Sequence, residues 1–417
     1  MRLKILFIHK NFPGQFKDIA PCLAENLSAE VRFLSLSSNP QNIAIPGVRL
    51  ERFQCHREVN RAIHSYLHPV EQGVLNGQAV IRKLYELSEK GFTPNVVIAH
   101  SGFGFSSYIR CVYPSCKIIA YSEWYFSREN IIRLLPNSKL DTIMKVETRN
   151  LPILQESLNA DLIITPTKWQ ASQFPKSLAK QIKIIFDGID TTLFHDGFQP
   201  EELEITGSDL SESLILPAEV PILTYGTRGM EPMRGFPQFM RAAAHAQKTF
   251  SDLHVVVFGK DRVAYGMSEI ECPHKSGSWK TALLEELSEI LDLSRIHFTG
   301  LISYKDLSRL FRRTSLHCYF TEPYVVSWGV FQAAASGCPL LTNSFPGIDE
   351  VLTSSNTAER VNLHNQDEIN RTVVSLLKEP KTLQRINQLT AGMTVQDAQS
   401  SWIKVIKQLT DNFQQAT

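Results

Sequence analysis

Short, unbroken apolar runs recur along this chain and constrain its fold more than any other feature. The first half contains KILFI, EVRFLSL, NVVIAH, KIIAYS, DLIITP and IKIIF, and the second half contains PILTYG, LHVVVFG, RIHFTG, SLHCYF and CPLLTN. Strands that are apolar throughout are typical of parallel sheets covered on both faces. Polar or helix-period sequence such as FKDIAPCLAENL follows the runs, so the pattern predicts an α/β fold with doubly wound sheets.

An acidic, serine-rich segment at residues 195–213 interrupts this pattern, and we interpret it as a linker or a surface excursion. A chain of 417 residues is too long for one ordinary core. We therefore predict an N-terminal domain at 1–190, a second domain at 191–395, and a C-terminal helix at 396–417 that packs back on the first domain. Ligands are expected beyond the carboxyl ends of the strands, in a cleft that the two domains face.

Composition gives no polyelectrolyte signature, although it rules out neither nucleic acid nor a membrane as a partner. The formal net charge is +1 and no block of Lys and Arg occurs, so neither nucleic acid nor a polybasic membrane anchor is indicated. The N-terminus has no signal-peptide pattern and no apolar run reaches membrane-spanning length, which predicts a cytoplasmic protein. A peripheral contact with the inner face of the membrane is compatible with the sequence but not indicated by it. The seven scattered cysteines favour buried, reduced thiols.

Several common motifs are absent. NFPGQF follows the first strand in place of a Gly-x-Gly-x-x-Gly loop, and no Gly-x-Ser-x-Gly elbow occurs. His64 and His68 have the i, i+4 spacing of metal ligands and could join Cys55 or His56, but such pairs are more often surface or packing residues. We predict no metal and no cofactor.

Two stretches in the second half carry phosphate-binding chemistry. After the strand PILTYG, a loop holds Arg228 and Arg234, which could grip a diphosphate or could be ordinary solvated charges. About ninety residues later, Ser327 is a candidate N-cap for a helix whose first N–H groups would attract an anion. The bland alternative is that Ala333 to Ala335 only let this helix pack closely on a sheet.

With these two stretches in this order, the chain resembles a bacterial branch of the retaining nucleotide-sugar glycosyltransferases of family 4. Members of that family have the two-domain, Rossmann-like GT-B fold. The resemblance covers nearly the whole chain and is carried, in order, by ILFIHKNFPGQF, VVIAHSGFG, AYSEWYF, LIITPTKWQASQFP, IIFDGIDT, GTRGMEPMRGF, VVVFGKD, RIHFTGLISYKDLSRLF, SWGVFQAAASGCPL and SFPGIDEVL.

This resemblance implies roles for residues of the second domain. Arg228 and Arg234 would hold the donor diphosphate, although the family usually has Lys at the second place. Ser327, Trp328 and Gly329 would aim their N–H groups at its oxygens. The family typically has two glutamates eight positions apart, for the sugar and the ribose, where this sequence has Tyr324 and Gln332. Glu322 lies two residues before the first of these places, and a local bulge could bring it to the sugar.

The first domain would hold the acceptor. His100 ends the strand VVIAH; the matching position places it beside the transferred sugar, while a purely structural histidine is the alternative. Gly14 would let the backbone approach the donor or acceptor closely. Glu123, Trp124 and Tyr125 combine a carboxylate with aromatic rings and suit acceptor recognition, although Trp124 could equally belong to the core.

The implied reaction is metal-independent hexosyl transfer with retention from a nucleotide diphosphate sugar to a hydroxyl group of a glycan, a lipid-linked glycan or a small molecule. The acceptor attacks from the face that the diphosphate leaves, and the phosphate takes the proton. Two alternatives are a nucleotide-sugar epimerase on the same fold and a non-catalytic nucleotide-sugar-binding protein.

Overall fold

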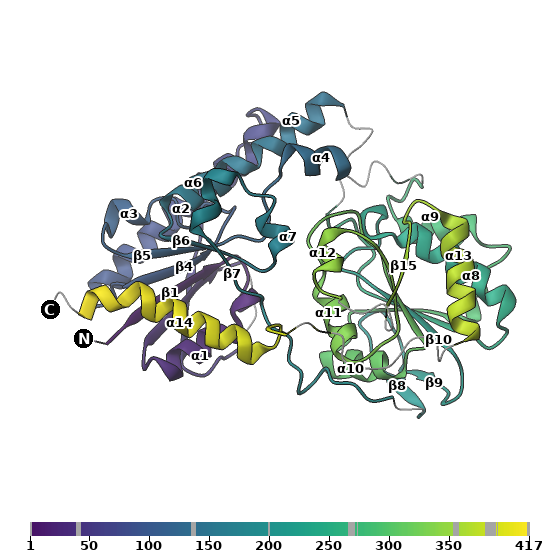
Figure 1. Ribbon diagram of the computed structural model, residues 1–417. Coiled ribbons are helices and arrows are strands. Elements are labelled where there is room, and N and C mark those ends of the chain that lie inside the picture. The colour runs from purple at the N-terminus through teal and green to yellow at the C-terminus, as the bar shows by residue number, and fades with distance from the viewer. Residues whose placement is uncertain are drawn as a thin grey trace. The chain divides into compact units, whose positions relative to one another are not determined.

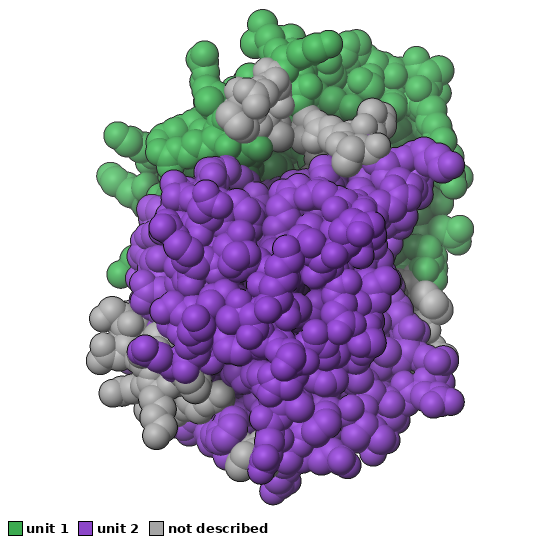
Figure 2. All heavy atoms as spheres, turned by 90° about the vertical axis from the view of Figure 1, so that its right-hand side faces the viewer, with its two compact units in different colours: residues 1–188, 392–417 green, residues 189–391 purple. Residues whose placement is uncertain are grey.

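The protein was analysed as a computed structural model that describes residues 2–38, 43–134, 139–198, 201–265, 272, 274–352, 358–379, 389 and 391–414. The chain divides into two compact units, distinguished by colour in Figure 2. Unit 1 comprises residues 1–188 and 392–417, and unit 2 comprises residues 189–391.

Unit 1 is built on a seven-stranded parallel sheet in the order β3-β2-β1-β4-β5-β6-β7. Its strands are β1 (Lys4–His9), β2 (Glu30–Leu36), β3 (Val48–Phe53), β4 (Val96–His100), β5 (Lys117–Tyr121), β6 (Leu162–Thr165) and β7 (Ile182–Ile184). Its helices are η1 (Gly14–Phe16), α1 (Ile19–Asn26), η2 (Ser65–Leu67), α2 (His68–Glu89), α3 (Ile109–Val112), α4 (Arg128–Leu134), α5 (Leu140–Thr148), α6 (Asn150–Asn159), α7 (Lys168–Ala171), η3 (Lys176–Gln181) and α14 (Val395–Gln414).

Helices cover both faces of this sheet, as the continuous apolar strands predict. One face packs against α2 through Val80, Leu84 and Leu87. The other packs against α1 and α14, and Figure 1 shows these two helices side by side. Trp402 of α14 lies in the same core cluster as Phe7 and Phe16, and is 2% exposed. The C-terminal helix therefore completes the core of unit 1.

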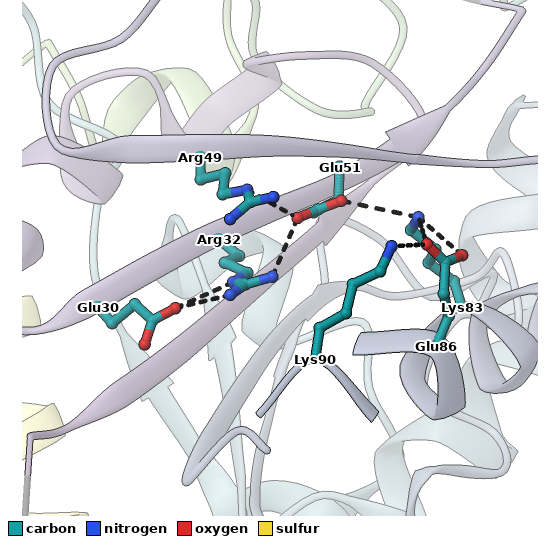
Figure 3. Close-up of polar contacts among 7 residues, drawn as sticks. All are labelled: Glu30, Arg32, Arg49, Glu51, Lys83, Glu86 and Lys90. Atoms are coloured by element: carbon teal, nitrogen blue, oxygen red, sulfur yellow. Dashed lines mark hydrogen bonds and ion pairs between the residues drawn. The ribbon is translucent and has the colours of Figure 1, made fainter. Parts of the chain in front are cut away.

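A charge network ties the edge of this sheet to α2 (Figure 3). Arg32 of β2 is buried and donates to Glu30 and to Glu51 of β3, at 2.9 and 3.1 Å. Lys83 of α2 reaches both Glu51 and Glu86. The buried guanidinium is thus compensated by carboxylates, as a desolvated charge requires.

Unit 2 has a six-stranded parallel sheet in the order β12-β11-β10-β13-β14-β15 and a separate antiparallel pair. The strands are β8 (Leu203–Ile205), β9 (Leu214–Leu216), β10 (Ile222–Gly226), β11 (His254–Phe258), β12 (Ile296–Gly300), β13 (Leu316–Tyr319), β14 (Leu340–Asn343) and β15 (Ala358–Val361). The helices are η4 (Pro232–Arg234), α8 (Phe236–Thr249), α9 (Trp279–Glu286), η6 (Leu293–Arg295), α10 (Tyr304–Arg313), α11 (Trp328–Ala335), α12 (Pro346–Asp349) and α13 (Gln366–Lys378).

The acidic segment at 195–213 is not merely a linker, which corrects our interpretation of the sequence. Within its described part, Leu203 and Ile205 form β8, which pairs with β9. Both side chains are buried against Leu310 of α10 and Ile222. Period-2 alternation of apolar and charged residues produced a half-buried strand that the overall acidity of the segment concealed.

Candidate functional site

Polar side chains gather in unit 1 at the place where the strand order of its sheet reverses. β1 and β4 are neighbours there, although β2 and β3 lie on one side and β5 to β7 on the other. His9 ends β1 and His100 ends β4, and their rings meet edge-on with centroids 4.8 Å apart. Glu123, just after β5, places Oε2 3.4 Å from His100 Nε2. Such switch points are where open α/β sheets bind ligands.

Glu123 is held as a carboxylate by its neighbours. Gln15 donates from Nε2 to Glu123 Oε1 at 2.7 Å. Burial alone would raise the pKa of Glu123, but the bonds from His100 and Gln15 and the nearby histidines lower it below its ordinary value. An oriented His100–Glu123 pair therefore stands at the carboxyl edge of the sheet.

His9 and Gln15 were missed by the sequence analysis. Burial and the neighbouring His100 lower the pKa of His9 to about 4, so its ring is neutral near pH 7. Gly14 lies against that ring: with φ of +55°, a Cβ there would come within 2.7 Å of it. Gly14 thus lets the backbone pass close to the His9 ring. The available signal was that His9, like His100, is the last residue of a predicted strand.

A buried carboxylate fixes the loop that follows His100. Glu156 of α6 is fully buried and accepts from the backbone N–H groups of Gly102, Gly104 and Ser106, at 2.6, 3.1 and 3.0 Å. The Ser106 hydroxyl also donates to it, at 3.1 Å. Gly104 has φ of +77° and lies so close to α2 that a Cβ would meet the Gly73 carbonyl. Backbone donors on a glycine-containing turn form a site for an anion, and here the Glu156 carboxyl group fills it. Burial raises the pKa of Glu156, and the hydrogen bonds from Gly102, Gly104 and Ser106 oppose that rise.

Two cavities open beyond the strand ends of unit 1. The Phe103 cavity, of 890 Å³, is lined by the segments after β1 to β4 and by α2, and includes Phe103, Lys10, Arg57 and Glu58. The Tyr125 cavity, of 540 Å³, is lined by side chains from the segments 125–133 and 169–176.

The three predicted acceptor residues do not share one environment. Glu123 faces His100, whereas Trp124 is 6% exposed and packs near Trp169, with ring centroids 6.1 Å apart. Tyr125 is half-buried, lies 5.6 Å from the Phe174 ring, and lines the Tyr125 cavity. Of the two interpretations of Trp124, the structure shows the core position.

In unit 2 the strand order reverses between β10 and β13, and the two phosphate-binding stretches of the sequence follow these strands. Arg234, in η4, is 3% exposed. Its Nη1 donates to the Thr321 hydroxyl at 2.8 Å, the Val325 carbonyl at 3.0 Å and the Tyr319 hydroxyl at 3.2 Å. Within the described residues, it forms no ion pair with a carboxylate.

Aromatic rings cover the remaining side of this guanidinium. The Arg234 Cζ atom lies 4.7 Å from the centroid of the Tyr265 ring and 5.8 Å from that of Tyr324. Its Nε is buried and has no hydrogen-bond partner among the described residues. Tyr324 thus packs near the guanidinium group of Arg234. Arg228 is exposed, with Nη1 3.4 Å from the Tyr265 hydroxyl.

Tyr319 joins the arginine loop to the start of α11. Its hydroxyl accepts from Arg234 and, at 2.8 Å, from the backbone N–H of Ser327. Ser327 caps the helix as predicted, accepting from the Gly329 N–H at 3.4 Å. The expectation that Ser327 and Gly329 aim their N–H groups at phosphate is therefore corrected: the Tyr319 hydroxyl accepts from the first and the Ser327 hydroxyl from the second. Trp328, at the first helical position, begins a helix whose amino end lies next to Arg234.

Gln332 and Glu322 complete this region. Gln332 is 7% exposed, and its side-chain amide has no hydrogen-bond partner within the described residues. Glu322 places Oε1 3.5 Å from His364 Nε2, and its backbone N–H donates to the Met233 carbonyl. Burial raises the pKa of Glu322, although His364 acts in the opposite direction.

Over the described part of the chain, no group of three or more His, Cys, Asp and Glu side chains could hold a metal ion. Among the same residues, no helix is long and apolar enough to cross a membrane.

Comparison with known proteins identifies the class. A model described as Glycosyl transferase family 4 group matches residues 28–194, and one described as Glycosyl transferases group 1 matches residues 212–391. No curated protein shows a significant sequence match.

Solved structures share the fold over the full chain. Sucrose-phosphate synthase from Thermosynechococcus elongatus has a TM-score of 0.66 at 13% identity, covering 100% of this chain and 99% of its own. Anabaena HepE in complex with UDP-glucose has a TM-score of 0.64 at 13% identity, covering 98% and 100%. The N-terminal domain of Candida albicans trehalose-6-phosphate phosphatase has a TM-score of 0.66 at 14% identity, covering 98% and 97%.

The fold is therefore GT-B, as predicted, with two parallel-sheet α/β units. Because family matches cover both units, this chain belongs to the family 4 type of glycosyltransferases and transfers a sugar from a nucleotide-sugar donor.

Proposed function

We propose that this glycosyltransferase holds the donor diphosphate at Arg234 in unit 2 and transfers the sugar, with retention and without a metal ion, to a hydroxyl group bound by unit 1. The observation that carries the proposal is Arg234 itself. A desolvated guanidinium is costly unless an anion accompanies it. No carboxylate within the described residues does so, and the leaving diphosphate would supply the missing charge.

The residues around Arg234 have supporting roles in this proposal. The amino end of α11, with Ser327, Trp328 and Gly329, adds a favourable dipole for phosphate. Arg228 gives a second, more exposed contact. The unpartnered Gln332 amide pairs with a ribose hydroxyl, and Glu322 and Tyr324 border the sugar.

In the transfer, the acceptor oxygen attacks the anomeric carbon from the face that the diphosphate leaves. The carbon–oxygen bond to phosphate breaks, a new one to the acceptor forms, and a phosphate oxygen takes the acceptor proton. Arg234 stabilises the charge that develops on the leaving group. His100, oriented by Glu123, is the residue of unit 1 that we assign to the transfer step. Neither residue needs to form a covalent bond.

UDP-glucose is the first donor to test, because HepE is solved with it. Incubation of UDP-glucose with a panel of hydroxyl acceptors should release UDP and give a product whose anomeric configuration, read by NMR, matches the donor. An inverted product would overturn retention. Consumption of donor without any acceptor would instead indicate the epimerase.

His100→Ala gives the internal control. Turnover should fall while calorimetric affinity for the nucleoside diphosphate stays close to that of the parent, because Arg234 is unaltered. If a folded His100→Ala protein lost nucleotide binding, the assignment of the donor to unit 2 would be wrong.

A further inference from the structure

We propose that the Tyr125 cavity binds a phosphate group carried by the acceptor. The inference rests on the proposed function, since it assumes that unit 1 holds the acceptor. It goes further by naming the chemical class of that acceptor, a phosphate ester.

The charge of the cavity favours an anion. Three cationic side chains line it, Arg128, Arg133 and Lys176, against the single carboxylate of Glu129. Glu129 is already paired with Arg133, at 2.6 Å. Arg128 and Lys176 form no ion pair with any described residue, so two positive charges remain uncompensated at the lining.

The walls of the cavity are firmly built. Phe174 and Trp169 are 7% and 8% exposed and form an aromatic side with Tyr125. Gln173 is buried, with its side-chain amide donating to the Trp169 carbonyl at 3.2 Å and accepting from the Ser127 hydroxyl at 3.1 Å. These contacts hold the segments after β5 and β6 together, so the two cations project from a fixed frame.

The Phe103 cavity lacks this surplus charge. There, Arg57 is paired with Glu71 at 2.7 Å, and Glu58 adds a carboxylate to the lining. Amides and hydroxyls, such as those of Gln54 and Ser37, make up much of the remainder. This cavity suits neutral hydroxyl groups, whereas the Tyr125 cavity suits an anion.

The Tyr125 cavity is also connected to the residues assigned to transfer. Tyr125 lies two positions after Glu123, and Gln170 donates from Nε2 to the Glu123 carbonyl at 2.8 Å. A phosphate bound by Arg128 and Lys176 would anchor an acceptor beside the segment that carries Glu123. Bidentate contact from an arginine and a point charge from a lysine are common in phosphate recognition.

The phosphate could belong to a soluble sugar phosphate or to a lipid. Large apolar side chains are exposed on the adjoining α4 and α5: Ile132 at 47%, Leu140 at 69% and Met144 at 43%. They would lie against acyl or prenyl chains if the source is a lipid. The two sources share one headgroup chemistry and are separated by the experiment.

The test measures phosphate binding in an Arg234→Met background, which removes the buried cation of unit 2. Methyl phosphate is titrated by calorimetry, and co-sedimentation uses phosphatidylcholine vesicles with and without phosphatidic acid. The double substitution Arg128→Gln with Lys176→Gln should weaken binding about tenfold or more, because it removes two charge-assisted contacts. Lys180→Gln, on the same η3 but outside the cavity, is the matched control and should bind like the background protein.

Each outcome decides the proposal. Loss of methyl phosphate binding in the double variant supports it with a soluble source, and loss confined to phosphatidic acid vesicles supports it with a lipid source. Equal binding by the double variant and Lys180→Gln would overturn it, as would no binding of either probe by the Arg234→Met protein. Nucleotide binding is measured separately on protein with Arg234 intact, so failure of the donor assignment is distinguishable from failure of this one.

Discussion

Arg32 in unit 1 and Arg234 in unit 2 are both almost fully buried, but their surroundings differ. Arg32 is 6% exposed and lies between Glu30 and Glu51, whereas Arg234 is 3% exposed and meets hydroxyls, a carbonyl and tyrosine rings. The first charge is neutralised within the fold, while the second has no carboxylate partner among the described residues. A buried arginine is therefore informative about function only together with its partners.

The same contrast extends to the two switch points. In unit 1, Glu123 is paired with His100 and Gln15, and the buried Glu156 is saturated by backbone donors. In unit 2, Arg234 and the amide of Gln332 keep unused capacity within the described residues. Glu123 and Glu156 of unit 1 thus have protein partners, whereas Arg234 of unit 2 has no carboxylate partner among the described residues.

The largest expected effect concerns Glu156, the buried residue of unit 1 that accepts hydrogen bonds from backbone N–H groups. Glu156→Ala leaves three backbone N–H groups without their acceptor and should lower the free energy of unfolding by about 3–5 kcal/mol. Urea unfolding, with hydrogen exchange reporting on unit 1, measures this.

Because the vacated site is a backbone anion site, acetate should restore part of the lost stability to Glu156→Ala. Ser157→Ala, the buried neighbour whose hydroxyl has no partner among the described residues, is the control and should be insensitive to acetate. If acetate affected neither protein or both equally, Glu156 would not be acting as an internal anion.

Acid should lower the free energy of unfolding of both units, and the loss should continue to a lower pH in unit 2 than in unit 1. Burial lowers the pKa of His317 in unit 2 to about 3, and burial with the charge of His100 lowers that of His9 in unit 1 to about 4. Below pH 6.5, the ordinary pKa of histidine, the imidazole is protonated in the unfolded chain but stays neutral in the folded chain. The free energy of unfolding therefore falls as pH falls. Each histidine should cost about 1.4 kcal/mol per pH unit in its window.

Unfolding measured between pH 7 and pH 4 checks this. His317→Gln should flatten the acid loss of unit 2, and His9→Gln that of unit 1, relative to the parent. Parallel pH profiles for variant and parent would show that the two imidazoles are not held neutral.

Exchanging each buried arginine for methionine tests the central contrast directly. Arg234→Met should weaken nucleoside diphosphate binding by about 1.5–3 kcal/mol while leaving the stability of the ligand-free protein unchanged or higher. Arg32→Met should lower stability, because Glu30 and Glu51 lose the buried guanidinium that they share, and should leave nucleotide affinity intact. Calorimetry measures nucleotide affinity and urea unfolding measures stability in both variants. A loss of affinity in Arg32→Met together with a loss of stability in Arg234→Met would contradict the prediction. Arg228→Ala should have the smaller effect on affinity, since Arg228 is exposed.

The smallest expected effect is at Gln332. Gln332→Ala should cost about 0.5–1.5 kcal/mol of nucleotide affinity through the loss of one hydrogen bond to ribose. Gln332→Glu should preserve or tighten binding, because a carboxylate accepts more strongly. Should Gln332→Ala bind nucleotide like the parent while Gln332→Glu melts early, the residue is a packing element of α11 and the ribose lies elsewhere.

The predicted strands that are apolar throughout, such as β1, β4 and β11, are present in the structure, because burial on both faces requires continuous apolar sequence. The strands β3 and β15 were not predicted. Both lie at sheet edges, and their sequences VRLERF and AERV mix charged with apolar residues. Edge strands need less apolar surface, so their composition resembles that of loops.

Candidate site residues likewise divide into those found from the sequence and those missed. Arg234 and Ser327 were found from local motifs, since an arginine loop and a helix cap are encoded by adjacent residues. Their convergence on Tyr319 was not visible in the sequence. His9, Gln15 and Glu156 were missed because their partners are distant: 108 positions separate Gln15 from Glu123, and 54 separate Gly102 from Glu156.

The sequence by itself determined the fold class, the parallel sheets and the cap of α11 at Ser327, because apolar periodicity and capping are local properties. Only the tertiary structure decided which charges are compensated. Arg32 and Arg234 each follow a glutamate within three positions, Glu30 and Glu231, and the sequence does not show which arginine has a carboxylate partner. Their difference arises from side chains that folding brings together, and from the low dielectric of the interior, which makes the presence or absence of a carboxylate partner decisive.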